Sequence, residues 1–360
     1  MCTLYAAQPI QPLFKNEFNL TNFQAVIFTT VIMLPLGVAP ILYGYILESF
    51  SARSMLFFSM IFLGILEIIF SFSNSYIILL SLRALQGLII PAALTSLISY
   101  ISVTSPPELI QKSVGNYIAT TIIGGFLARF LSGLSSQYFG WKPFFFIIGV
   151  LLIIFSFVLS SIKKDVKVDY VKPTIKEIGK VLKIKHNVLI YLSMFFVFFV
   201  FQATLNFLPF ELKALDGVDE GKIGFIYIGY GIGVIISLNV TNIINFFKNE
   251  KNAMIVGVII YSIGVMLFHI SNFWIMLGSM FVFCCGMFTI HSIATGYINR
   301  YAKDKKAIAN GLYLSFYYSG GTLGTFLPIF VYQEYGWGVL LNTLLFLLMF
   351  AASFLFLLKK

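Results

Sequence analysis

Long apolar runs dominate this chain, and short polar segments separate them. About 20 apolar residues in a helix cross a bilayer, and by that rule the sequence predicts eleven complete membrane spans. They lie near 23–47, 54–72, 76–102, 113–137, 142–162, 187–209, 223–246, 253–270, 272–299, 307–332 and 338–358. The 14 residues before Lys15 are too few to cross alone. We expect them to form the outer half of a first helix whose other half lies upstream, and a genuinely shortened first helix is the alternative.

One long polar stretch interrupts the apolar pattern, from Lys163 to Asn187. From Pro173 onward its residues allow an amphipathic helix on the inner membrane face. We interpret 163–186 as a linker between an N-terminal bundle, 1–162, and a C-terminal bundle, 187–360.

Part of the first half recurs in the second. Residues 115–141 align without a gap on residues 311–337, 196 positions later, and ten of the 27 positions are identical. The shared residues include two Gly-Gly pairs, 124–125 and 320–321, and two closing Gly-Trp pairs. Two similar hydrophobic halves are typical of secondary transporters, whose substrate site lies between the repeats.

Composition and charge agree with a membrane protein. The mean hydropathy is +0.92, with 59% hydrophobic and 11% charged residues, whereas soluble proteins have roughly 45–50% and 25%. Three cysteines, two of them adjacent, offer no disulfide framework. The net charge of +10 is not interpreted as a nucleic-acid footprint, because the basic residues lie in short loops between spans.

Those basic residues predict the orientation. Loops on the side of the linker carry 18 Lys and Arg, and loops on the other side carry four. Cytoplasmic loops are the ones enriched in Lys and Arg. We therefore expect a multi-pass protein of the cytoplasmic membrane, with the central linker and the C-terminus in the cytoplasm.

Several motifs resemble those of the major facilitator superfamily. Arg83 to Gly87 reads RALQG, which matches the R-x-x-Q-G pattern of that family in the fourth span. Spans are numbered here with the incomplete first helix as the first, so 76–102 is the fourth. The family's gate loop follows the second span and reads G-x-x-x-D-R-x-G-R-K. This chain retains the glycine as Gly44, has Glu48 as the acid, and has Arg53 as the last base. The intervening Ser and Ala residues depart from it.

The fifth span is similar to the family's antiporter pattern, G-x8-G-x3-G-P-x2-G-G. Gly124 and Gly133 match, whereas Ala128, Arg129 and Ser132 replace Gly, Pro and Gly. An arginine in place of the proline, followed by a Phe-Gly-Trp loop, resembles the acriflavine-sensitivity, or YnfM-like, efflux branch. Segments beginning at residues 3, 286 and 311 resemble it too.

The resemblance implies an all-α integral membrane protein with the twelve-helix major facilitator fold, made of two six-helix bundles. It implies a secondary active transporter that moves a small organic solute by alternating access, with proton-coupled efflux as the first choice. Uptake stays open because the antiporter pattern is degraded. We expect a small-molecule substrate, protons and the lipid bilayer as partners, a monomer, no cofactor, no metal and no nucleic acid.

Charged side chains inside a span are candidates for function, because they are costly there. Arg83 and Arg129 lie in the outer half of the N-terminal bundle and could bind an anion or influence a proton site. Alternatively, their guanidinium groups hydrogen-bond carbonyls and amides of neighbouring helices. Glu67, near the level of Arg83, could carry protons, since a desolvated carboxyl group can exchange them near neutral pH, or it could be an ion partner of Arg83.

Histidine and amide side chains complete the candidates. His291 in the tenth predicted helix titrates in the range needed for proton coupling, but it could equally be a neutral group bonded to a neighbouring helix. Amides near prolines can donate to and accept from a substrate. These are Gln8 and Gln11, beside Pro9 and Pro12, Gln202 and Asn206, before Pro209, and Gln86 of the RALQG motif. Further candidates, for which aromatic packing is the alternative, are Asn116, Tyr117, Tyr313, Tyr317 and Tyr318.

Glycines predict close helix contacts that can slide during alternating access. They are Gly124, Gly125, Gly133, Gly320, Gly321 and Gly324.

Three other classes of protein were weighed against a carrier. A membrane enzyme is disfavoured, since the sequence has no H-E-x-x-H, no G-x-S-x-G and no paired intramembrane Asp. It has no G-x-x-x-x-G-K-[ST] either, so we do not expect ATP to be the energy source. A channel, and a receptor built on a transporter fold, remain alternatives.

Overall fold

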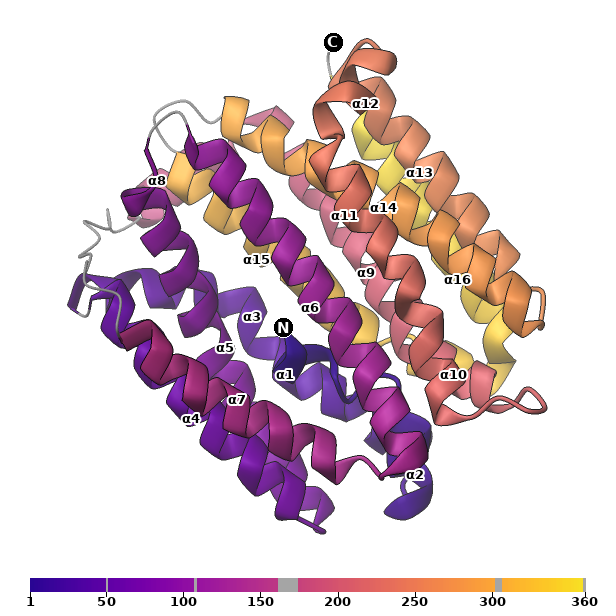
Figure 1. Ribbon diagram of the computed structural model, residues 1–360. Helices are drawn as coiled ribbons and strands as arrows, with labels where there is room; N and C mark the ends of the chain where they lie inside the picture. Colours follow the sequence, from indigo (N-terminus) through magenta and orange to yellow (C-terminus); the bar gives the residue numbers. More distant parts are fainter. Residues whose placement is uncertain (50, 107–108, 161–173, 302–305, 359–360) are drawn as a thin grey trace.

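The computed structural model describes residues 1–49, 51–106, 109–160, 174–301 and 306–358 (Figure 1). Within these ranges, only the backbone is described at residues 38–49, 102–103, 110–112, 114, 160, 175, 299, 301 and 306–307. All regular elements in the described ranges are helices.

The first half of the chain, up to residue 160, forms seven helices. They are α1 (Cys2–Tyr5), α2 (Gln11–Glu17), α3 (Asn22–Ser49), α4 (Ala52–Phe72), α5 (Tyr76–Thr104), α6 (Ile110–Tyr138) and α7 (Lys142–Ser160). The second half, from residue 174, forms ten. They are α8 (Ile175–Leu182), α9 (Lys185–Lys213), α10 (Glu220–Phe225), the 3-10 helix η2 (Ile226–Gly231), α11 (Ile232–Leu238), α12 (Val240–Phe246), α13 (Glu250–Leu267), α14 (Phe273–Tyr301), α15 (Lys306–Phe326) and α16 (Ile329–Phe356).

Each of the eleven predicted spans corresponds to helical structure. Counting only the described residues, nine helical segments are long and apolar enough to cross a membrane, and the apolar part of α3, Asn22–Gly37, is shorter. Helix α15 is not among the nine, since serine, threonine, tyrosine and glycine dilute its apolar residues.

Three predicted spans differ from the structure, two in continuity and one in where the helix ends. Residues 1–14 are not a continuous half helix, because the chain leaves the helical path between α1 and α2, around Pro9. The span predicted at 223–246 is divided among α10, η2, α11 and α12. The span predicted to end at 332 ends at Phe326, and α16 begins at Ile329 with a kink at Gly336.

Close helix crossings within each half use glycine. Helices α4 and α7 cross at Gly64 and Gly149, where a Cβ on either residue would lie 2.7 Å from the carbonyl oxygen of the other. Helix α15 packs against α9, and α9 in turn against α16. Residues without side chains allow such backbone-to-backbone approach.

Contacts between the two halves follow two seams. In one, α3 packs against α15, and in the other, α6 packs against α10, η2 and α11 (Figure 1). Gly133 lies on the second seam, where a Cβ would be 2.6 Å from the carbonyl oxygen of Glu220. Beyond it, the Nε2 of Gln137 donates to Oδ2 of Asp219 at 2.9 Å. Nearer the other end of α6, Gly115 has open space beside it and Asn116 is exposed.

The repeated residues occupy similar positions in both halves. Gly140 and Gly336 both have a positive φ, 81° and 76°, which glycine adopts without steric cost. The tryptophan that follows each is buried, and its indole nitrogen donates to another element, from Trp141 to Glu17 and from Trp337 to the carbonyl of Phe268. The internal repeat therefore extends from sequence to structure.

The predicted amphipathic helix in the linker exists as α8. Its first turn has a capping box, in which Thr174 and Glu177 satisfy each other's backbone N–H groups. Residues 161–173 of the linker lie outside the described residues.

Candidate functional site

Arg83 is fully buried on α5 and is surrounded by carbonyl groups. Its Nη1 donates to the carbonyl of Thr3 (2.6 Å), its Nη2 to that of Leu4 (3.1 Å) and its Nε to that of Phe28 (3.3 Å). The first two acceptors belong to α1, a helix of four residues that cannot satisfy its own last carbonyls. Arg83 thus holds the N-terminal segment against α3 and α5, as in the second of the two alternatives weighed from the sequence.

Glu67 lies close to this arrangement. It is fully buried on α4, and its polar neighbours are Arg83, Thr3 and Gln86. The side chains of Thr3 and Gln86 face its carboxylate, although neither carboxylate oxygen, nor Nε2 of Gln86, forms a hydrogen bond of ordinary geometry with a described residue. The Oε1 of the same amide accepts from Nη1 of Arg83 at 3.1 Å. The structure therefore brings Glu67, Gln86 and Arg83 together, with Gln86 in contact with the arginine.

Arg129 occupies a different environment on α6. Its Nε donates to Oε1 of Gln8 (2.7 Å) and its Nη1 to the carbonyl of Gly125 (2.9 Å). The guanidinium carbon lies 4.0 Å from the ring centroid of Tyr5, 5.0 Å from that of Tyr230 and 5.2 Å from that of Tyr227. A cation over aromatic faces is stabilised by the ring quadrupoles. Because the last two tyrosines belong to η2, Arg129 joins the two halves.

A chain of amides and hydroxyls crosses the other seam. The Nε2 of Gln11 donates to Oγ1 of Thr29 (2.6 Å) and to Oδ1 of Asn206 (2.7 Å), and Nδ2 of Asn206 donates to the carbonyl of Thr325 (2.9 Å). The hydroxyl of Thr325 donates to that of Thr30 at 3.0 Å. Gln11, Thr29 and Thr30 are in the first half, so these bonds connect the halves through buried side chains.

Gln202 joins the same seam one turn from Asn206. Its Nε2 lies 3.0 Å from the sulfur of Met33, and its Oε1 is buried without a partner among the described residues. The side chain of Tyr5 lies close to it. Gln202 therefore lies between the α3 seam and the surroundings of Arg129.

His291 lies on α14 among aromatic rings. Its Nδ1 is 2.9 Å from the hydroxyl of Tyr313, and its ring centroid is 4.7 Å from that of Tyr317. The side chain is partly exposed, although it lies well inside a candidate membrane span. The position therefore combines a titratable ring with a hydroxyl partner.

The glycines predicted to pack helices lie at several kinds of contact. A Cβ on Gly320, Gly321 or Gly324 would overlap the carbonyl of Phe195, the ring of Phe198 or the carbonyl of Phe199, all on α9. In the first half, the equivalent pair faces α1. A Cβ on Gly124 would lie 3.3 Å from Met1, and one on Gly125 would lie 3.6 Å from the ring of Tyr5.

The predicted gate loop is described only in part. Gly44 and Glu48 belong to α3, but their side chains lie outside the described residues. Arg53 is partly exposed in the first turn of α4, whose N-terminus is capped by the hydroxyl of Ser51.

A cluster of tyrosines lies between the halves. The hydroxyl of Tyr318 lies in the neighbourhood of those of Tyr5, Tyr117, Tyr230 and Tyr313, and that of Tyr317 lies near those of Tyr5, Tyr230, Tyr313 and Tyr318. We call these six residues the tyrosine cluster. Tyr117 and Tyr318 are partly exposed, whereas the other four are buried. The sequence analysis missed Tyr5, Tyr227 and Tyr230, for which the only signal was an aromatic residue in a glycine-rich or proline-rich run.

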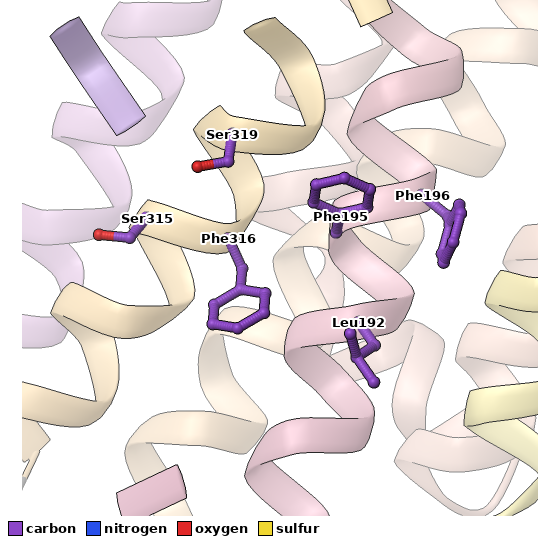
Figure 2. Close-up of a pocket in the computed structure, with 6 residues that line it drawn as sticks. All are labelled: Leu192, Phe195, Phe196, Ser315, Phe316 and Ser319. Carbon is purple, nitrogen blue, oxygen red and sulfur yellow. The ribbon is translucent and has the colours of Figure 1, made fainter. Parts of the chain in front are cut away.

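An apolar pocket of about 300 Å³ opens between α9 and α15 (Figure 2). It is lined by Leu192, Phe195, Phe196, Ser315, Phe316 and Ser319. Figure 2 shows that both serine hydroxyls, on α15, point away from α9. Leu192, Phe195 and Phe196 form the wall that α9 contributes. No charged side chain lines this pocket. In the described part of the chain, no three His, Cys, Asp or Glu residues lie close enough to hold a metal ion.

Comparison with known proteins decides the family. The family model of the Major Facilitator Superfamily matches residues 1–325. The chain belongs to the Major Facilitator Superfamily. It is therefore a multi-pass membrane transporter rather than an enzyme, as the relatives' names also indicate.

This transporter is similar to several bacterial proteins over most of its length. It is 27% identical to an uncharacterized transporter of Buchnera aphidicola subsp. Schizaphis graminum, covering 90% of the chain and 80% of the relative. It is 26% identical to the uncharacterized MFS-type transporter YybF of Bacillus subtilis, covering 89% and 82%. It is 24% identical to the inner membrane transport protein YnfM of Escherichia coli, covering 93% and 81%. The resemblance to the YnfM-like branch is thereby supported.

Proposed function

We propose that this transporter moves a small organic solute across the cytoplasmic membrane by alternating access, driven by protons and in the direction of efflux. In this proposal 1–162 and 187–360 are the two moving bundles of a monomer. The linker 163–186 and the C-terminus face the cytoplasm, in keeping with the distribution of Lys and Arg.

The observation that carries this proposal is the placement of the contacts between the halves. Gln137 with Asp219, Gly133 with Glu220 and Thr30 with Thr325 all join the halves toward one end of α6 and α3. Farther along α6 toward the other end, Tyr117 is partly exposed. Short polar bonds and glycine contacts can be broken and remade, as an interface that opens and closes requires.

Counterflow in proteoliposomes tests transport itself. Vesicles containing the purified protein and unlabelled solute are diluted into labelled solute, and the transient accumulation of label is measured. We test benzoate, benzamide and ethidium in turn, as an anion, a neutral compound and a cation. We expect accumulation of the anion or the neutral compound, because a carrier exchanges solute in both directions. A channel or a receptor would give no counterflow with any of them.

Proton coupling is assigned first to His291, because its imidazole ring can titrate and its Nδ1 lies 2.9 Å from the hydroxyl of Tyr313. Replacing His291 with Gln should abolish accumulation driven by a pH gradient in inverted vesicles and leave counterflow intact, since glutamine cannot exchange a proton. Loss of both activities would indicate damage to binding or folding. Retention of both would remove His291 from coupling and leave Glu67, beside Arg83, as the coupling group.

Uptake is the second candidate for direction. It stays open because the antiporter pattern is degraded, with Ala128, Arg129 and Ser132 in place of the family's Gly, Pro and Gly. In that pattern the proline and glycines shape the helix at the interface, whereas here Arg129 joins it to η2. The sign of the pH gradient that drives accumulation in the same inverted vesicles distinguishes efflux from uptake.

A further inference from the structure

The surroundings of Arg129 lack an anion. Among the described residues no carboxylate forms an ion pair with this guanidinium, although the group is fully buried. Its Nη2 is buried and forms no hydrogen bond of ordinary geometry with a described residue, although the hydroxyl of Tyr230 lies close to the guanidinium. Nε2 of Gln8, whose Oε1 accepts from Arg129, is also buried without a partner among the described residues. Buried donors without acceptors are rare in folded proteins and costly. Two such donors, one of them cationic, therefore indicate an acceptor that binds there.

The side chains around these donors are aromatic. Tyr5 and Tyr230 lie over the guanidinium and are also members of the tyrosine cluster. Tyr317 extends the cluster by stacking on Phe198 at 3.7 Å between ring centroids. The tyrosine cluster extends from the partly exposed Tyr117 and Tyr318 toward the buried Arg129. It therefore surrounds the guanidinium mostly with aromatic ring faces and phenol hydroxyls.

We infer that the transported solute is a small aromatic carboxylate, whose anionic group binds Nη2 of Arg129 and Nε2 of Gln8 while its ring packs among the tyrosines. This inference rests on the proposed function, because it names the solute of the same transporter. The guanidinium has no exposed surface in this conformation, so binding requires that surrounding tyrosine side chains move.

The positive charge of Arg129 excludes an organic cation as the solute of this site. Aromatic boxes often bind organic cations, but here the box already holds the cation of Arg129. A second positive charge would be repelled by the first. The apolar pocket of Figure 2 has no charged group in its lining to receive an anion.

The tyrosine rings around Arg129 favour an aromatic over an aliphatic ligand. Aromatic pairs gain about 0.5–1.5 kcal/mol beyond the area that they bury, a factor of roughly two to ten in affinity. Gly125 adds space next to the arginine, since any side chain there would begin 3.4 Å from Nη1 of Arg129 and 3.6 Å from the ring of Tyr5.

Equilibrium binding to the purified, full-length chain in lipid nanodiscs tests the inference. Three labelled probes of similar size are compared: benzoate, cyclohexanecarboxylate and benzylamine. We expect saturable binding of benzoate, weaker binding of cyclohexanecarboxylate and none of benzylamine. This comparison needs no substitution, so a variant that fails to fold cannot obscure it. Binding of benzylamine but not of benzoate would overturn the inference.

Two substitutions then locate the site. Arg129→Gln should weaken benzoate binding about ten- to hundredfold, because hydrogen bonds to charged groups are the strongest polar contacts. Tyr318→Leu, at a partly exposed position, should weaken benzoate binding roughly two- to tenfold and leave cyclohexanecarboxylate binding unchanged. Lys142→Gln, which removes one positive charge from the partly exposed first turn of α7, is the matched control and should change neither. Equal benzoate affinity in Arg129→Gln and the control would also overturn the inference.

The binding and counterflow experiments give different outcomes when this inference is wrong and when the proposed function is wrong. If benzoate binds through Arg129 but gives no counterflow, the binding site stands and transport by alternating access is wrong. If benzamide gives counterflow but benzoate neither binds nor exchanges, transport stands and the aromatic carboxylate is wrong.

Discussion

Replacing Arg83 with Gln is expected to lower the thermal unfolding midpoint sharply and to abolish transport as a consequence. The side chain supplies donors to the carbonyls of Thr3, Leu4 and Phe28 inside a membrane protein, where water cannot replace them. Each buried acceptor left without a donor costs about 1–3 kcal/mol. Glu67, one of whose neighbours is this guanidinium, would also lose the nearby positive charge. The unfolding midpoint of purified protein in detergent measures the effect.

Arg300→Gln is the matched control for this substitution. Its side chain is 65% exposed and pairs at 3.2 Å with Glu250, whose side chain is 10% exposed. An ion pair with an exposed partner contributes about 0–1 kcal/mol, and Glu250 keeps the favourable N-terminus of α13 when Arg300 is replaced. We expect a small shift in the midpoint for Arg300→Gln and a large one for Arg83→Gln. A folded Arg83→Gln variant with an unchanged midpoint and lost solute binding would contradict the structural role and make Arg83 a binding residue.

The contrast between the two buried arginines marks how far the sequence could predict the site. Both stood out as intramembrane charges, and for both the sequence left two roles open. Arg83 binds backbone carbonyls with all three of its guanidinium nitrogens, whereas Nη2 of Arg129 faces tyrosine side chains and forms no hydrogen bond of ordinary geometry with a described residue. That difference depends on helices distant in sequence, α1 for Arg83 and η2 for Arg129. No pattern within α5 or α6 records it.

The fold was more predictable than the site, for a physical reason. Spans are set by the length of apolar runs, which the bilayer imposes on the sequence directly. Breaks within them are harder to predict, because freed backbone groups can be satisfied by neighbouring helices. The interruption between α1 and α2 and that at Asn239 are of this kind. The tyrosine cluster was missed in part because its six tyrosines come from four elements, α1, α6, η2 and α15, which meet only in the folded chain.

Gly133→Val is expected to hold the two halves apart at the end where they now touch. A Cβ on Gly133 would lie 2.6 Å from the carbonyl oxygen of Glu220 and 2.8 Å from the Cα of Gly224, both in the other half. Separation of the halves relieves this overlap, so the protein can remain folded in the opposite conformation. The side chains of Gln137 and Asp219, which now share a hydrogen bond of 2.9 Å, report the change. With native cysteines removed, a Gln137→Cys and Asp219→Cys pair should cross-link readily in the parent chain and poorly with Gly133→Val.

Gly320→Ala should act differently, although it too adds bulk at a glycine contact. Its Cβ would overlap the carbonyl of Phe195 on α9, in the same half, so no movement between the halves relieves the strain. We expect a cost of about 1–3 kcal/mol, seen as a lower unfolding midpoint with the cross-link between 137 and 219 preserved. Gly278→Ala, which meets nothing within 4 Å on α14, is the control and should slightly stabilise the helix. If Gly133→Val lowered the midpoint as Gly320→Ala does and left the cross-link intact, the α6 seam would be a fixed contact rather than one that opens during transport.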